Sequence, residues 1–142
     1  MEKIQFDSGI REYRLNGAGV LRFNPGDPNL YARFMEAVEE IKDMEKKLSE
    51  QAGADDGMTV LKLLQDADRQ MKQSLNRVFG QGNDFDKILG GVNLLAIGAN
   101  GERVVTNLFA ALQPILLQGA EACAKEQTQA AVSRAKARRS AQ

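Results

Sequence analysis

The sequence predicts a mainly α-helical domain with an N-terminal β-hairpin, an α+β fold in which a helical hairpin is followed by a buried C-terminal helix. Two observations carry this prediction. Apolar and polar residues alternate over residues 12–15 and 20–23, which is the period of a half-buried strand. From residue 27 onward the apolar residues recur at steps of three and four, which is the period of an amphipathic helix.

The hairpin loop is expected at residues 16–19, Asn-Gly-Ala-Gly, because glycine supplies the positive φ angles that tight hairpin loops need. Ahead of it, Ile4, Phe6 and Ile10 with a turn signal at residues 7–9 suggest a short additional strand. A sheet of two or three strands is marginal in water by itself. We therefore expect it to pack against the helices.

Two helices of similar length should follow. The first is expected to begin at Asp27, whose side chain can cap the free N–H groups, with Pro28 at the first helical position. The second is expected over residues 59–79 and should stop at Gly80. A short link at residues 52–57 joins them, so they predict an antiparallel helical hairpin.

The remainder of the chain predicts a short helix over residues 85–89 and a last helix beginning near Glu102. The apolar run over residues 92–97 fits a buried helical turn or a strand equally well. Beyond Gly119 the chain becomes rich in Ala and Gln. We expect one globular domain over residues 1–119, comprising a hairpin region (1–26) and a helical region (27–119). Residues 120–142 should form a projecting basic helix or a flexible tail.

Composition narrows the class of protein. The chain has 142 residues, one cysteine and no histidine, so it lacks the commonest general base and metal ligand, and it cannot form an intramolecular disulfide. The N-terminus does not resemble a signal peptide, and the longest apolar runs are too short to span a bilayer. We therefore expect a cytoplasmic protein that does not enter membranes.

We expect no catalytic residue, no bound metal and no cofactor. Adjacent Asp55 and Asp56 lack the alternating spacing of a calcium loop and are typical of a solvated turn. Asp84 and Asp86 fit the start of a short helix better than a metal site. Cys123 has no histidine to activate it, and the glycine-rich segments lack the Gly-Lys-Ser/Thr of a phosphate-binding loop.

The apolar seams of the helical hairpin are the first candidate partner surface. Burial in the core is the default interpretation for each residue, but a small sheet could leave part of the seams uncovered. The residues of this candidate surface are Phe34, Val38, Ile41, Leu61, Leu64, Met71 and Leu75.

The basic C-terminal segment is the second candidate surface. Residues 128–142 contain four basic residues and no acidic one, although the whole chain has a net charge of zero. The basic residues are Arg134, Lys136, Arg138 and Arg139. They could contact nucleic acid or an acidic protein, or they could simply favour the negative end of a helix dipole.

The order of these features resembles the phage tail assembly chaperones of Gram-positive siphophages and prophages. The resemblance covers most of residues 10–117. Its segments are YRLN at 13–16, VLRFNPGDP at 20–28, FMEAVEEI at 34–41, VFG at 78–80, DKILGG at 86–91 and the final apolar helix.

The resemblance implies a non-enzymatic role in virion assembly in the host cytoplasm. Proteins of that family coat the tape measure protein and help to recruit tail tube subunits, so these two proteins are the expected partners. The resemblance transfers no catalytic residues, and self-association stays open. An alternative is a small nucleic-acid-associated or regulatory phage protein that uses the basic tail.

Overall fold

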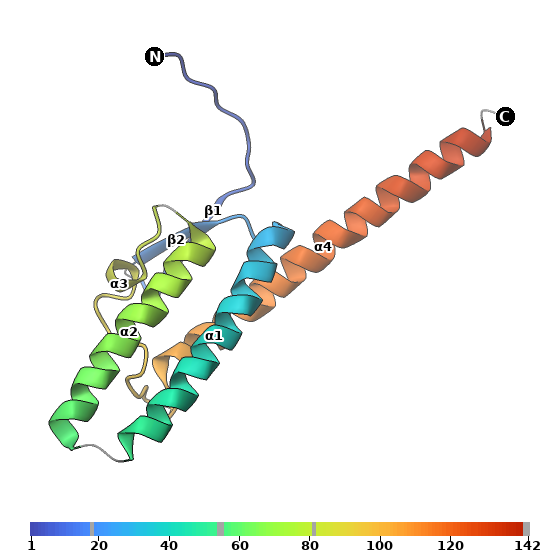
Figure 1. Cartoon of the computed structure of the whole chain (residues 1–142). Coiled ribbons are helices and arrows are strands. Elements are labelled where there is room, and N and C mark those ends of the chain that lie inside the picture. Colours follow the sequence, from blue (N-terminus) through green and yellow to red (C-terminus); the bar gives the residue numbers. More distant parts are fainter. Residues whose placement is uncertain (18, 54–55, 81, 141–142) are drawn as a thin grey trace.

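The protein is mainly helical and begins with a two-stranded antiparallel hairpin, as the sequence predicts (Figure 1). The computed structural model describes residues 1–17, 19–53, 56–80 and 82–140. Its elements are β1 (Arg11–Leu15), β2 (Gly19–Phe23), α1 (Pro28–Ala52), α2 (Gly57–Phe79), α3 (Phe85–Ile88) and α4 (Val104–Ser140).

The hairpin packs one face on the helices. Tyr13 lies opposite Leu21 in the ladder and stacks on Phe23 with ring centroids 4.6 Å apart. Leu21 and Phe23 are buried, whereas Arg22 between them is exposed. Positive φ angles at Asn16 (50°) and Gly17 (80°) turn the chain between the strands. The alternation in the sequence therefore marks the true strands.

The prediction of an additional strand before the hairpin is wrong, because residues 1–10 form no strand. Gly9 has a φ of 77°, which turns the chain away from the line of β1. The Asn24 side-chain amide donates to the Ser8 carbonyl over 3.1 Å and holds this turn. Residues 1–10, called the N-terminal arm below, consequently extend into solvent (Figure 1).

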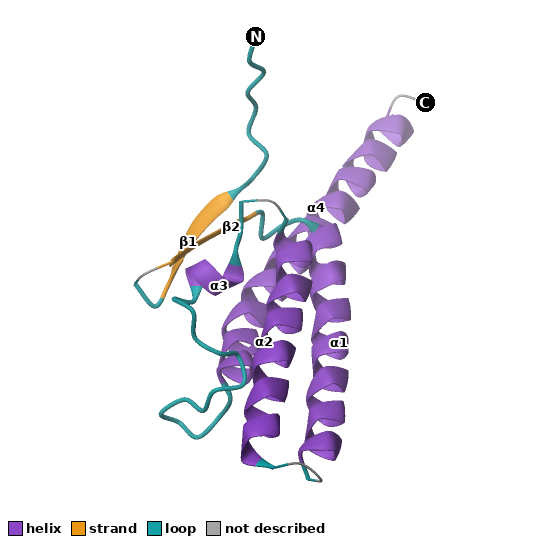
Figure 2. Cartoon of the chain, turned by 60° about the vertical axis from the view of Figure 1, so that its left-hand side comes forward, coloured by secondary structure: helices purple, strands orange, loops and turns teal. Residues whose placement is uncertain are grey.

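The N-cap predicted at Asp27 is confirmed, and Asp56, which the sequence placed in a solvated turn, caps α2 as well. Asp27 accepts a hydrogen bond from the Asn29 N–H over 2.9 Å, and Asp56 accepts one from the Thr59 N–H over 2.8 Å. Gly80 ends α2 with a φ of 84°. The helices α1 and α2 lie side by side and antiparallel (Figures 1 and 2).

The core lies where α1, α2, the hairpin and the first half of α4 meet. From α4 it receives Val105, Leu108, Leu112 and Leu116. The second half of α4 continues as a helix to Ser140 and projects beyond the other elements (Figure 1). Residues 120–140 are therefore a projecting helix, and residues 141–142 lie outside the described part. The run over residues 92–97 is neither helix nor strand, and Ile97 forms an isolated bridge with Arg103.

Candidate functional site

The structure places most of the predicted apolar partner surface in the core. Five of the seven residues are at most 4% exposed. These five are Phe34, Val38, Ile41, Met71 and Leu75. In the folded chain these five residues therefore belong to the core, which is the default interpretation of their spacing, and they do not form an accessible seam.

Two packing contacts account for this burial: α1 and α2 pack against each other, and the first half of α4 packs along α1. Phe109 of α4 meets Phe34 of α1 edge-to-face with ring centroids 5.6 Å apart. Phe79 of α2 also meets the Phe34 ring edge-to-face, with ring centroids 6.4 Å apart. Only Leu64, which is half-buried, and Leu61, which is 55% exposed, remain accessible from the predicted set.

The largest exposed apolar side chains lie instead in the N-terminal arm. Ile4 is 90% exposed, Phe6 81% and Ile10 59%. Their alternating spacing predicts a strand, which these residues do not form. The turn signal at Asp7-Ser8-Gly9 correctly separates this segment from the hairpin, but it does not show whether the segment pairs as a strand.

A smaller apolar patch lies at the start of α2. Met58 is 76% exposed and lies one turn from the exposed Leu61. Residues three apart on a helix share a face. This patch is at the tip of the helical hairpin, distant in Figure 1 from the N-terminal arm.

The four basic residues of the second candidate surface are all exposed. Arg134, Lys136, Arg138 and Arg139 lie in the last two turns of α4, on the projecting half of the helix. No acidic residue follows Glu126 in the sequence. The charged side chains at the far end of α4 are consequently all positive, and the other elements do not cover this end of the helix (Figure 1).

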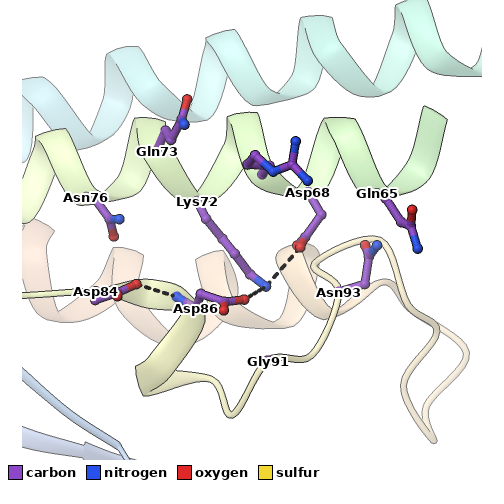
Figure 3. Close-up of a pocket in the computed structure, with 10 residues that line it drawn as sticks. Gln65, Asp68, Lys72, Gln73, Asn76, Asp84, Asp86, Gly91 and Asn93 are labelled. Atoms are coloured by element: carbon purple, nitrogen blue, oxygen red, sulfur yellow. Dashed lines mark hydrogen bonds and ion pairs between the residues drawn. The ribbon is translucent and has the colours of Figure 1, made fainter. Parts of the chain in front are cut away.

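A polar groove lies between α2, α3 and the loop after α3 (Figure 3). Its volume is about 660 Å³. At its floor the Lys72 ammonium lies 2.9 Å from an Asp68 oxygen and 2.6 Å from an Asp86 oxygen. The second Asp68 oxygen accepts the Leu94 N–H over 2.8 Å. Lys72 therefore ties α2 to α3, and Asp68 ties α2 to the following loop.

The chemistry of the groove is that of a structural ion pair. Burial lowers the pKa of Lys72, but hydrogen bonds from its ammonium to Asp86 and Asp68, with the charges of both carboxylates, outweigh that effect and raise the pKa overall. The amine thus stays protonated and is not a nucleophile. Asp84 caps α3 by accepting the Asp86 N–H over 3.1 Å, so both acids have local roles.

The structure also locates the remaining candidate residues that the sequence suggested. Within the described ranges, no three His, Cys, Asp or Glu side chains gather as a metal site. Cys123 is half-buried on α4, and Asp55 lies outside the described residues. Among the helices of residues 1–17, 19–53, 56–80 and 82–140, none is long and apolar enough to cross a membrane.

Comparisons with protein-family models, with curated proteins and with solved structures find no match to this chain.

Proposed function

We propose that this chain is a non-enzymatic assembly chaperone of phage tails that binds apolar helices of the tape measure protein and helps to recruit tail tube subunits. In this role it works in the host cytoplasm by reversible burial of apolar surface. Two findings support this function: the resemblance over residues 10–117 and one structural observation. That observation is an arm with four largely exposed apolar side chains, those of Met1, Ile4, Phe6 and Ile10, next to a well-packed body.

The arm suits a transient contact. Burying an exposed Ile or Phe side chain contributes about 1.5–3 kcal/mol. Ile4 and Phe6 are on a segment that the body does not cover, so a partner can bury them without unfolding the core. The patch at Met58 and Leu61 adds a second apolar contact on the body.

The side-chain chemistry also favours a binding protein over an enzyme. The chain has no histidine, and its most buried amine, Lys72, is held protonated between two carboxylates. A protonated amine cannot attack or accept a proton. We therefore propose that no covalent step is part of its function.

The test is binding of the full chain to a purified apolar helical segment of a tape measure protein encoded beside it, measured by calorimetry. The double variant Ile4→Ser/Phe6→Ser should lose about tenfold or more in affinity, because two apolar contacts are removed. The matched control, Lys3→Ser/Gln5→Ser on the same arm, should bind as the unmodified chain does.

Two results would count against this proposal. Absence of any complex with the helical segment would overturn the chaperone function itself. Equal affinity of the double variant and the control would show that the arm is not the contact. The variant Leu61→Ser would then test the remaining exposed residue of the predicted seam.

A second candidate function is nucleic-acid binding by the basic end of α4, and the exposure of its four basic residues favours it. Four phosphate contacts give a slope of log affinity against log salt of about −3 to −4. Binding by burial of apolar surface should not show this dependence of affinity on salt. A salt titration with duplex DNA, repeated with Arg138→Gln/Arg139→Gln, therefore separates the two functions.

A further inference from the structure

The two edges of the hairpin differ in their hydrogen bonding. On the β2 side, the Asn83 side chain accepts from the Arg22 N–H over 2.9 Å and donates to the Arg22 carbonyl over 2.8 Å. The backbone of Gly19 also lies directly against Ile88 of α3. Asn83 and α3 therefore close the outer edge of β2.

The outer edge of β1 is open. Because both backbone groups of Arg22 point away from β1, its ladder partner Glu12 belongs to a pair without mutual hydrogen bonds. The backbone N–H and C=O groups of Glu12, and by alternation those of Arg14, consequently point away from β2. Within the described residues these groups have no hydrogen-bond partner. Figure 2 shows β1 on the side of the hairpin away from α3.

The charges along this edge are self-complementary. We propose that β1 pairs antiparallel with β1 of a second copy of the chain, about a two-fold axis that passes through Tyr13. In this register Glu12 of each copy lies opposite Arg14 of the other, and both residues direct their backbone groups toward the partner strand. Four backbone hydrogen bonds and two opposite-charge pairs then form across the interface.

The same charges disfavour the neighbouring registers. A shift of two residues in one direction places Glu12 opposite Glu12, and a shift in the other places Arg14 opposite Arg14. Like charges directly opposite each other are destabilising. Glu12 already lies 3.1 Å from Arg22 on the same face of its own sheet. In the proposed pair its carboxylate therefore lies between two guanidinium groups.

The pairing also keeps each face of the sheet in its environment. Glu12 and Arg14 are on the exposed face, whereas Tyr13 and Leu15 are half-buried against the core. A two-fold axis perpendicular to the sheet gives a four-stranded sheet with both cores on one side. An open edge of this kind readily accepts a further strand. This inference does not depend on the proposed function.

The test is sedimentation of the full chain over a dilution series from about 1 mM to about 1 µM, a range that covers weak complexes. The unmodified chain should dimerise as concentration rises. Arg14→Glu and Glu12→Arg should each weaken the association constant about tenfold, because each places like charges across the axis. The matched control, Lys62→Glu on the exposed face of α2, carries the same charge change as Arg14→Glu and should dimerise normally.

A mixture of the two variants provides the decisive measurement. In a heterodimer of Arg14→Glu with Glu12→Arg, every cross-axis pair is again of opposite charge, so equimolar mixing should restore association. Amide hydrogen exchange supplies a second readout that does not depend on variants. In the unmodified chain, the Glu12 and Arg14 N–H groups should become protected as concentration rises, while that of Arg22 should not change.

Three results would overturn the proposal. The first is a monomer at every concentration, and the second is dimerisation that neither charge reversal weakens. The third is failure of the mixture to recover when circular dichroism shows both variants folded.

Discussion

Gly119 of α4 lies directly against the backbone carbonyl of Pro25, in the turn that leads from β2 into α1. A Cβ atom at Gly119 would overlap with that carbonyl oxygen. This contact marks the point where α4 stops contributing to the core and begins to project, because Leu116 is its last buried residue. The absence of a side chain here allows the turn and the helix to touch.

Gly119→Ala should therefore destabilise the fold, although alanine has the higher helix propensity. Forcing a methyl group against fixed backbone costs about 1–3 kcal/mol. Urea unfolding followed by circular dichroism measures the change. Gly57→Ala is the matched control, since a Cβ at Gly57 meets nothing within 4 Å. This substitution should stabilise α2 by about 0.5–1 kcal/mol. An equal response of the two variants would contradict the close contact.

Asn83→Ala should destabilise the sheet edge. Asn83 is 7% exposed, and its amide satisfies both backbone groups of Arg22 and the Phe79 carbonyl. Leaving such groups without partners costs about 1–3 kcal/mol. Native-state hydrogen exchange should show the Arg22 amide losing protection, with the α1 amides as internal control. Unchanged protection at Arg22 would mean that the bond to Asn83 does not form in solution.

Lys72→Met should cost about 3 kcal/mol, because it leaves the carboxylate of Asp68 buried without its cation. The side chain of Lys72 is 5% exposed and that of Asp68 15%. The control is Arg69→Met, which removes a solvent-exposed pair at 3.8 Å and should change stability by less than about 1 kcal/mol. Chemical unfolding at neutral pH compares the two, and similar losses would argue against a buried ion pair.

The same ion pair should make stability fall at alkaline pH. The pKa of Lys72 in the folded chain is raised, so its stabilising contribution is complete below the ordinary lysine pKa of about 10.4. It is lost as the pH rises through the higher folded value. Unfolding midpoints from pH 9 to pH 12 should therefore fall more steeply for the unmodified chain than for Lys72→Met. Parallel curves would show that Lys72 is not the titrating group.

Asp56 should contribute to the acid sensitivity of α2. The backbone hydrogen bond from Thr59, followed by its side-chain hydrogen bond, lowers the pKa of the Asp56 carboxyl. Its stabilising effect is thus present above the ordinary aspartate pKa of about 3.9 and is lost as the pH falls through the lower folded value. Asp56→Ala should melt earlier than the unmodified chain at pH 7, and the difference should shrink below pH 3. A difference that does not depend on pH would exclude the cap.

The local structure of this chain was readable from the sequence. Asp27 and Asp84 each cap the helix that follows, and Gly80 ends α2. The alternation around Tyr13 and Leu21 marks the paired strands. These features depend on residues within four positions of each other or on a tight turn, so a linear pattern is sufficient to identify them.

The candidate site was less readable, and the N-terminal arm shows why. The alternation of Ile4 and Phe6 is the same in a strand as in an exposed segment, because it describes the chain and not its neighbours. The contact of Lys72 with Asp68 is visible as a spacing of four on one helix. The contact of Lys72 with Asp86 depends on where the loop after α2 brings α3.

The sequence by itself determined the hairpin, the helical hairpin and the last helix to within a few residues of their ends, and which face of each is apolar. Only the tertiary structure decided which apolar faces are covered, because α4 closes the seam around Phe34 while leaving Leu61 and the arm in solvent. The physical reason is that periodicity results from local backbone geometry. Burial results from the packing of segments that lie far apart along the chain.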